Sequence, residues 1–278
     1  MADIKVGLAL GSGSARGLAH IGVLKVLVKE GIPIDMIAGT SAGAIIGGMY
    51  ATGMPVTEIE NTAKVLSHRK YAFLVDPTLP RTGLIKGKKV KEALKQYFKD
   101  TDFQDLKMPF ACVSTDLETG EAIIIKTGKV LEAVDASISI PIIFSMVEKD
   151  GRHLVDGGLV NPVPVSVLKD MGADYIIAVN VTPYNIQKTE FLKTHGIFHV
   201  IMQTLYISTY QITRASLSNA DVVIEPATDH ISPFAFDRIN ECIELGEKSA
   251  QKAIIEIKQQ LSDIRNGLRK PRSGDNCR

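Results

Sequence analysis

The sequence contains no tryptophan, three cysteines and almost no net charge. The cysteines Cys112, Cys242 and Cys277 lie far apart, and none belongs to a Cys-x-x-Cys pair. A disulfide scaffold and a cysteine-based metal site are therefore excluded, and free thiols in a reducing compartment are expected. A formal net charge of +1 excludes a chain built as a whole to coat nucleic acid.

Long apolar runs are also missing from the chain. No stretch reaches the ~20 apolar residues that a membrane-spanning helix needs. The first apolar run, residues 4–10, contains Lys5 and leads directly into Gly11, which is not a signal-peptide pattern. We therefore expect a cytoplasmic protein. With 45% hydrophobic and 23% charged residues, the composition excludes disorder as the main state and is typical of a globular domain.

Short apolar runs alternate with helical patterns, which predicts an α/β fold with a mostly parallel central sheet. Strands are expected at residues 4–10, 35–38, 110–115, 122–126, 153–155, 175–181 and 222–225. Helices are expected at residues 17–30, 190–218 and 237–266, and a small-residue helix is expected after the turn at residues 39–43, ending at Tyr50. We expect a single domain over residues 1–266, followed by a flexible polar tail over residues 267–278.

The strongest local motif is Gly39-x-Ser41-x-Gly43, between an expected strand and an expected helix. A tight strand-to-helix turn exposes the serine hydroxyl, and the glycines on either side leave room for it. The hydroxyl then lies beside the positive end of the next helix, which favours developing negative charge. The alternative is an ordinary serine N-cap, because five-residue patterns recur by chance.

A second glycine-rich turn follows the first expected strand, with the pattern Gly11-x-Gly13-x-x-Arg16-Gly17. Such a loop can direct successive backbone N–H groups at one anion. Dinucleotide binding is disfavoured, because Arg16 replaces the last glycine of that motif and no acidic residue ends the second strand. An oxyanion hole fits better, since adjacent parallel strands end at the same edge. The loop expected to form it comprises Gly11, Gly13, Ser14, Ala15, Arg16 and Gly17.

A third motif, Asp156-Gly157-Gly158, ends another expected strand. The two glycines suggest a tight turn that positions the carboxylate, although a plain Asp-Gly turn is the simpler alternative. A serine nucleophile needs an adjacent base, usually a histidine, so a Ser–Asp–His order remains open. His195 and His199 have helical spacing, but no glutamate between them and no third ligand, so no metal site is expected.

Together the three motifs resemble the patatin-like phospholipase family. The resemblance covers residues 4–182, and residues 114–120 and 135–141 are similar to recurrent segments of its bacterial members. Many members have glycines where this chain has Ser12 and Ser14, but backbone amides do not depend on side chains. The resemblance implies a three-layer α/β/α fold and a catalytic dyad in which Ser41 is the nucleophile and Asp156 its proton acceptor.

The same resemblance implies hydrolysis of an ester bond in a phospholipid, a lysophospholipid or a related acyl ester, with no metal or organic cofactor. The amides of Gly13 and Ser14, with Ala15 as a further candidate, would hold the oxyanion. An ordinary aspartate pKa near 3.9 is too low for a base at neutral pH, so we expect Asp156 to be partly desolvated. Arg16 is interpreted as a brace of the loop, with steering of an anionic headgroup as the alternative.

Two other functions remain open at this point: a Ser–His–Asp carboxylesterase, and a non-catalytic regulatory or adaptor protein on the same fold. The segment that begins at Lys64 and ends at Lys99 holds ten basic and two acidic residues. Its amphipathic part, residues 88–99, is interpreted as a surface helix docked by its apolar face. Peripheral contact with anionic lipid at the inner membrane surface is the alternative, and no nucleic-acid partner is expected. The patterns do not predict an oligomeric state.

Overall fold

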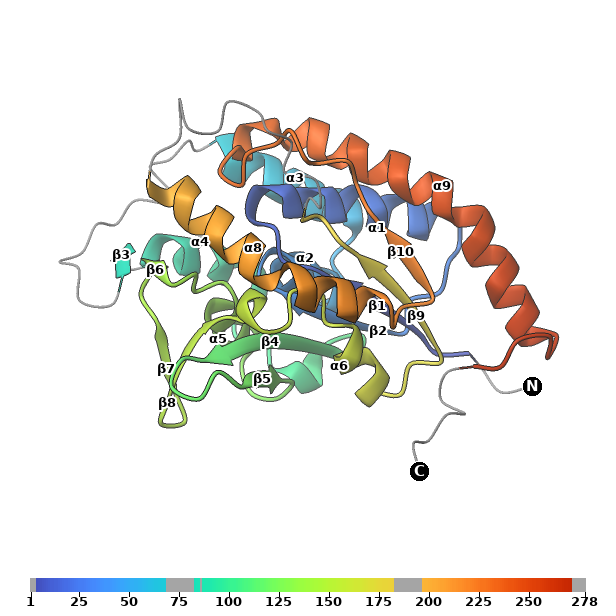
Figure 1. Cartoon of the computed structure of the whole chain (residues 1–278), viewed down its shortest axis with the longest axis horizontal. Helices are drawn as coiled ribbons and strands as arrows, with labels where there is room; N and C mark the ends of the chain where they lie inside the picture. The colour runs from blue at the N-terminus through green and yellow to red at the C-terminus, as the bar shows by residue number, and fades with distance from the viewer. Residues whose placement is uncertain (1–3, 69–82, 86, 183–196, 272–278) are drawn as a thin grey trace.

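A computed structural model describes residues 4–68, 83–85, 87–182 and 197–271. Its centre is an eight-stranded sheet in the order β10-β9-β1-β2-β4-β8-β7, with β5 paired to β4 (Figure 1). The strands are β1 (Val6–Leu10), β2 (Met36–Thr40), β4 (Phe110–Asp116), β5 (Ala122–Ile125), β7 (Val147–Lys149), β8 (Arg152–Asp156), β9 (Tyr175–Val179) and β10 (Val222–Ile224). A separate parallel pair joins β3 (Gly83–Ile85) to β6 (Ile142–Phe144).

The sheet is mostly parallel, as its sequence pattern predicts. The strands from β10 to β4 run parallel, whereas β5, β8 and β7 are antiparallel additions on one side. The inner strands are buried on both faces, and β1, β2 and β9 consist of buried residues throughout. Fully buried parallel strands read as continuous apolar runs, which explains why the sequence marks them clearly.

Helices cover both faces of the sheet, so the predicted three-layer α/β fold is confirmed (Figure 1). The helices are α1 (Ala19–Lys29), α2 (Ala42–Ala51), α3 (Val56–His68), α4 (Lys88–Phe98), α5 (Val130–Ser137), α6 (Val165–Asp170), α8 (Ile197–Leu217) and α9 (Ile239–Arg265). On one face, Leu8 and Leu10 pack in a core with α1, α2 and α9, and on the other Ala9 packs with α6 and the end of α8. Side chains of successive strand residues point to opposite faces, which divides the core in this way.

The predicted amphipathic helix in the basic segment is present as α4. Its apolar residues Ala93, Leu94 and Phe98 are buried against the rest of the domain. Three of its lysines are exposed on the outer face (Lys88, Lys89 and Lys95), while Lys91 pairs with Asp135 of α5 at 2.7 Å. The docked arrangement is therefore confirmed. Within the described ranges, no helix combines the length and the apolar character needed to span a bilayer. Cys112 and Cys242 are buried free thiols, while Cys277 lies outside the described residues.

Candidate active site

Strand register brings Ser41 and Asp156 to the same level of the sheet. In the parallel pair of β2 and β4, Thr40 lies opposite Val113. In the antiparallel pair of β4 and β8, Ser114 lies opposite Asp156. Ser41, which directly follows β2, and Asp156, the last residue of β8, therefore flank the same point of β4. Side-chain position in a sheet is set by register, so a slip of one residue would separate them.

Ser41 occupies a sharp turn between β2 and α2. Its backbone angles, φ of 55° and ψ of −118°, lie in a region that residues other than glycine rarely adopt. A Cβ added at Gly43 would lie 2.0 Å from the carbonyl oxygen of Leu10, so the turn needs glycine there. The Ser41 hydroxyl makes no helix-capping bond and instead donates to Oδ2 of Asp156 at 2.6 Å. The side chain is therefore not an ordinary N-cap.

The carboxyl group of Asp156 is buried and held from two sides. Oδ2 accepts the Ser41 hydroxyl, and Oδ1 accepts the backbone N–H of Gly158 at 2.7 Å. The turn is tight, because a Cβ at Gly157 would lie 2.2 Å from the Val113 carbonyl oxygen. Burial raises the pKa of Asp156 to about 6, against the opposing effect of its two hydrogen bonds. At neutral pH most of this carboxyl group is ionised and can accept a proton.

Most backbone amides at the start of the glycine-rich loop already have acceptors within the protein. Four of its amides donate to backbone carbonyl oxygens: Gly11 to Val179 (3.1 Å), Ser12 to Pro162 (2.8 Å), Ala15 to Pro233 (3.0 Å) and Arg16 to Gly13 (3.1 Å). Within the described ranges, the amides of Gly13 and Ser14 have no such acceptor. The structure therefore leaves Gly13 and Ser14 available for an oxyanion, and it occupies the amide of Ala15. Gly17 lets the loop approach α2, since a Cβ there would lie 2.3 Å from that of Ala42.

Arg16 is buried beneath the loop, with 7% of its surface exposed. Its Nε donates to the carbonyl oxygen of Ile231 at 2.7 Å, and its guanidinium lies 5.3 Å from the ring centroid of Tyr206. These contacts join the loop to α8 and to the segment before α9. They favour the interpretation of Arg16 as a brace over that of a headgroup ligand.

The histidines described by the structure do not contact Ser41. His153 and His230 bind Glu118 (2.6 Å) and Glu241 (2.7 Å) respectively. His20 is fully buried, and its Nε2 lies 2.8 Å from the carbonyl oxygen of Gly11. Burial lowers the pKa of His20 to about 4, so the ring is neutral and its Nε2–H supports the loop. No local pattern predicts this contact, because it depends on how α1 packs under the loop.

The remaining histidine side chains, those of His68, His195 and His199, lie outside the part of the chain whose side chains are described. Among the described residues, no group of three His, Cys, Asp or Glu side chains is arranged to hold a metal ion.

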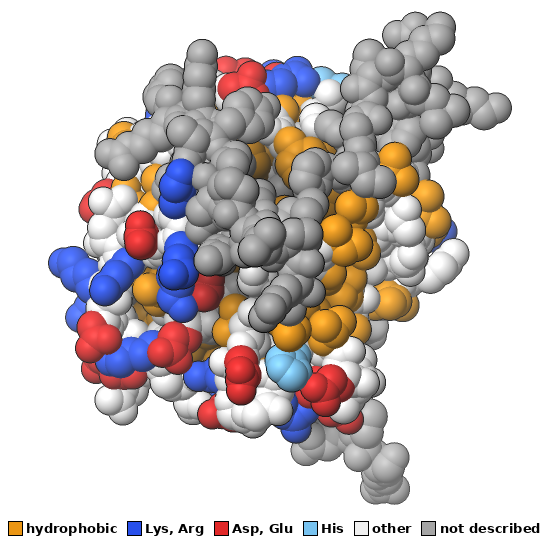
Figure 2. Space-filling model, turned by 90° about the vertical axis from the view of Figure 1, so that its left-hand side faces the viewer, with side chains coloured by type: hydrophobic (Ala, Val, Ile, Leu, Met, Phe, Trp, Pro, Cys, Tyr) orange, Lys and Arg blue, Asp and Glu red, His pale blue; other side chains and the backbone are white. Residues whose placement is uncertain are grey.

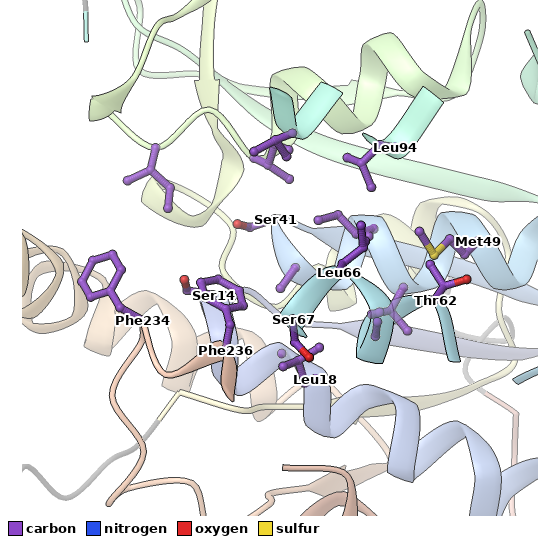
Figure 3. Close-up of a pocket in the computed structure, with 18 of the residues that line it drawn as sticks. Ser14, Leu18, Ser41, Met49, Thr62, Leu66, Ser67, Leu94, Phe234 and Phe236 are labelled. Atoms are coloured by element: carbon purple, nitrogen blue, oxygen red, sulfur yellow. The ribbon is translucent and has the colours of Figure 1, made fainter. Parts of the chain in front are cut away.

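An apolar cavity of about 220 Å³ opens beside Ser41 (Figure 3). Ala42, Ile45, Ile46 and Met49 line it along one side of α2, at the spacing of a helix face. Figure 3 shows Ser41 and Ser14 toward the side on which Phe234 lies, and Met49 and Thr62 on the opposite side. A smaller cavity of about 40 Å³ lies between Ser14, Asp156 and the α8 residue Tyr206. Ser41 therefore lines both cavities, and Asp156 lines the smaller one, whose lining mixes polar and apolar residues.

A serine in a strained strand-to-helix turn, at the C-terminal edge of a three-layer α/β sheet, is the arrangement of the α/β serine hydrolases. The family model described as patatin-like phospholipase matches residues 8–169. The chain belongs to the patatin-like phospholipase family, so the resemblance inferred from its three motifs is confirmed.

Known relatives place the same region within longer proteins. The chain is 38% identical over 177 residues to an uncharacterized NTE family protein of Mycobacterium bovis, covering 64% of this chain and 49% of that protein. It is 36% identical over 193 residues to lysophospholipase NTE1 of Meyerozyma guilliermondii, covering 66% of this chain and 13% of the relative. The crystal structure of VipD from Legionella pneumophila has the same fold, with a TM-score of 0.52 and 12% identity over 91% of this chain and 67% of VipD.

Proposed function

We propose that this chain is a serine hydrolase that cleaves ester bonds of phospholipids, lysophospholipids or related acyl esters through a Ser41–Asp156 dyad. The observation that carries the proposal is the 2.6 Å hydrogen bond from the Ser41 hydroxyl to a buried carboxyl group of raised pKa. The apolar cavity beside Ser41 and the name of the lysophospholipase relative support a lipid substrate.

The proposed reaction has two steps. Ser41 Oγ attacks the acyl carbonyl carbon while its proton passes to Asp156, and Asp156 then protonates the leaving alcohol. Water next attacks the acyl-Ser41 ester and gives its proton to Asp156, which returns it to Ser41 as the fatty acid leaves. The amides of Gly13 and Ser14 would stabilise the oxyanion in both steps, and each such donor contributes about 3 kcal/mol in serine hydrolases. This chemistry requires no metal or organic cofactor.

The cavity suggests how the acyl chain would lie. From Ala42 to Met49 the helix α2 advances seven residues, or about 10 Å at 1.5 Å per residue. An engineered cavity of ~150 Å³ in another protein holds benzene, so a cavity of about 220 Å³ can accept a short or medium hydrocarbon chain. We propose that acyl chains of about eight carbons fill it along α2.

The test is to treat the protein with a fluorophosphonate probe and locate the label by mass spectrometry, alongside hydrolysis of lysophosphatidylcholine and p-nitrophenyl octanoate. We expect label on Ser41, and we expect Ser41→Ala and Asp156→Asn each to abolish hydrolysis. Ser262→Ala, an exposed serine on α9, is the control and retains activity. Activity that survives in Ser41→Ala would refute the proposal. Labelling of Ser41 with no turnover of any lipid would favour a binding or adaptor role.

A second set of variants separates the dyad from a Ser–His–Asp triad. Each of the six histidines is replaced in turn by alanine, and the dyad predicts that no single replacement abolishes hydrolysis. His20→Ala is expected to lower activity in part, since His20 supports the loop.

We also propose that the outer face of α4 contacts an anionic membrane surface. Lys88, Lys89 and Lys95 are exposed, while Val90 of the same helix lines the cavity. Figure 2 faces the side on which α4 lies and shows Lys and Arg side chains interspersed with Asp and Glu side chains on its left half, and hydrophobic side chains mainly on its right half.

The free buried thiols support a location in a reducing compartment such as the cytoplasm.

Sedimentation with vesicles tests this contact. We expect the protein to bind vesicles rich in phosphatidylserine more tightly than phosphatidylcholine vesicles, and Lys89→Glu with Lys95→Glu to weaken that binding. The control is Lys252→Glu, an exposed lysine on α9. Equal loss in the control would show that only the net charge matters, which would overturn the proposed α4 contact.

A further inference from the structure

The segment at the end of α5, residues 135–141, contacts both members of the dyad. Ser137, the last residue of α5, is fully buried. Its hydroxyl accepts the backbone N–H of Ser41 at 2.9 Å and donates to the carbonyl oxygen of Val113 at 2.6 Å. One side chain thus joins the nucleophile turn to the neighbouring strand β4.

Two residues later, the same segment holds the proposed base. The backbone N–H of Asp156 donates to the carbonyl oxygen of Ser139 at 2.9 Å. The backbone of Ser41 and that of Asp156 are therefore both fixed to a stretch of three residues. Between these contacts lies Ile138, whose side chain lines the apolar cavity with that of Ile140.

The hydrogen bond from Ser137 opposes relaxation of a strained turn. The backbone angles of Ser41 are unfavourable for a residue other than glycine, and such a conformation persists only where its surroundings determine it. Removing the Ser137 hydroxyl would leave the buried N–H of Ser41 without this acceptor, and a buried unpaired donor is unfavourable. A turn that relaxed to find another acceptor would carry Oγ away from the carboxyl group.

We propose that Ser137 is a positioning residue, which holds the Ser41 amide so that the hydroxyl stays within hydrogen-bond distance of Asp156 and aimed at the substrate carbonyl. This inference rests on the proposed hydrolase function. Ser137 does not itself line the cavity, and its hydroxyl bonds to the backbone of Ser41 and Val113 rather than to the carboxyl group, so its link to the nucleophile runs through the backbone of Ser41. Because substrate binding depends on the cavity and not on Ser137, its loss should affect the chemical step and leave binding unchanged.

The experiment compares Ser137→Ala with Ser139→Ala, a matched control in the same segment. The Ser139 side chain is also buried, but its hydroxyl donates to the backbone carbonyl oxygen of Asp135. The contact of Ser139 with Asp156 is made by its backbone carbonyl oxygen alone. With p-nitrophenyl octanoate, we expect Ser137→Ala to lower kcat at least tenfold with KM changed less than twofold. The rate of fluorophosphonate labelling at Ser41 should fall in parallel. Ser139→Ala should stay within threefold of the native chain in both measurements.

Two further variants separate positioning from folding. Ser137→Thr keeps the hydroxyl group. Ser137→Val has nearly the same shape as Ser137→Thr but lacks the hydroxyl group. We expect Thr to recover most of the kcat that Val loses, at equal melting temperatures. Equal kcat in Thr and Val, or in the alanine variants of Ser137 and Ser139, would overturn the proposal. If the native chain is neither labelled nor active, it is the hydrolase function that fails, which the same measurements show directly.

Discussion

At the scale of single residues, Asp156 combines two properties that oppose each other. Burial makes its carboxyl group a stronger base than an ordinary aspartate, because the pKa rises to about 6. The same burial makes the ionised form unfavourable in the folded protein. A group that must be charged to accept a proton is thus kept where charge is costly. Two measurable consequences follow from this conflict.

The first concerns activity against pH. If Asp156 is the base in the free enzyme, kcat/KM should fall about tenfold for each pH unit below about 6, and level off above that value. The same curve should appear in the rate of fluorophosphonate labelling, which requires only the first step. Initial rates with a soluble ester between pH 4.5 and 8 measure it. A midpoint near 4 would show that the carboxyl group is not desolvated in solution.

The second concerns stability. Because the folded-state pKa of Asp156 is above the unfolded value, the folded state holds the proton more tightly, and this group lowers stability as pH rises from about 4 to about 6. A shift of this size corresponds to about 3 kcal/mol. Asp156→Asn has no group that titrates here. The unfolding free energy of the variant minus that of the native chain should therefore rise by up to this amount between pH 4 and pH 7. Urea denaturation at the two pH values measures it, and a constant difference would contradict the expectation.

At the scale of secondary-structure elements, α2 has two roles. Its N-terminus carries Ser41, and its side lines the apolar cavity. Because this helix begins at the nucleophile and extends along the cavity, the length of the proposed acyl chain depends on how many residues of α2 line the cavity. Met49 lines the cavity on the side away from Ser41 and is 2% exposed.

Shortening this side chain should therefore change chain-length preference. We expect Met49→Ala to raise the ratio of kcat/KM for p-nitrophenyl dodecanoate to that for the octanoate, at a cost of about 2–4 kcal/mol in stability. Ile59→Ala in α3 is the matched control, because Ile59 is fully buried but does not line the cavity. An equal change of ratio in both variants would show that the cavity is not the acyl site.

The crossing of α1 and α9 supports the glycine-rich loop from below. A Cβ at Gly22 would lie 2.0 Å from the carbonyl oxygen of Ile243, and one at Gly246 would lie 2.0 Å from that of Ala19. The two helix backbones are therefore nearly in contact. Since α1 follows the loop directly, this crossing fixes the direction in which the loop leaves the sheet.

Helix propensity predicts that Gly22→Ala stabilises the protein, whereas packing predicts that it destabilises the protein. Alanine stabilises an isolated helix by about 0.5–1 kcal/mol relative to glycine. Here the backbone of α9 leaves no space, so we expect a loss of several kcal/mol, as for an overpacked core. Thermal unfolding measures it, with Val28→Ala at an exposed site of α1 as the control. A more stable Gly22→Ala would show that the helices separate easily.

At the scale of the whole molecule, the candidate site exists only because distant segments converge. Ser41 and Asp156 are 115 residues apart, and the loop braced by Arg16 meets a carbonyl group 215 residues away. Four segments surround the dyad. Three of them follow the strands β1, β2 and β8 of one sheet, and the fourth follows α5. Rigid strands thus set the positions of the groups, and the turns set their directions.

The sequence by itself determined the local parts of this protein. Apolar runs marked the buried parallel strands, and the motifs at Gly11, Ser41 and Asp156 identified the turns that follow them, because a turn that needs glycine shows it in a few consecutive residues. The fold class followed from the alternation of strand and helix patterns, and the family followed from those motifs.

Only the tertiary structure decided what depends on residues far apart. The antiparallel direction of β8, the engagement of the Ala15 amide by Pro233, the neutral His20 and the contact of Ser137 with Ser41 have no local pattern. The apolar cavity likewise joins side chains from α2, α3 and α4. Register and helix packing across the sheet create these features, and a hydrogen bond between distant residues leaves no periodic signal along the chain.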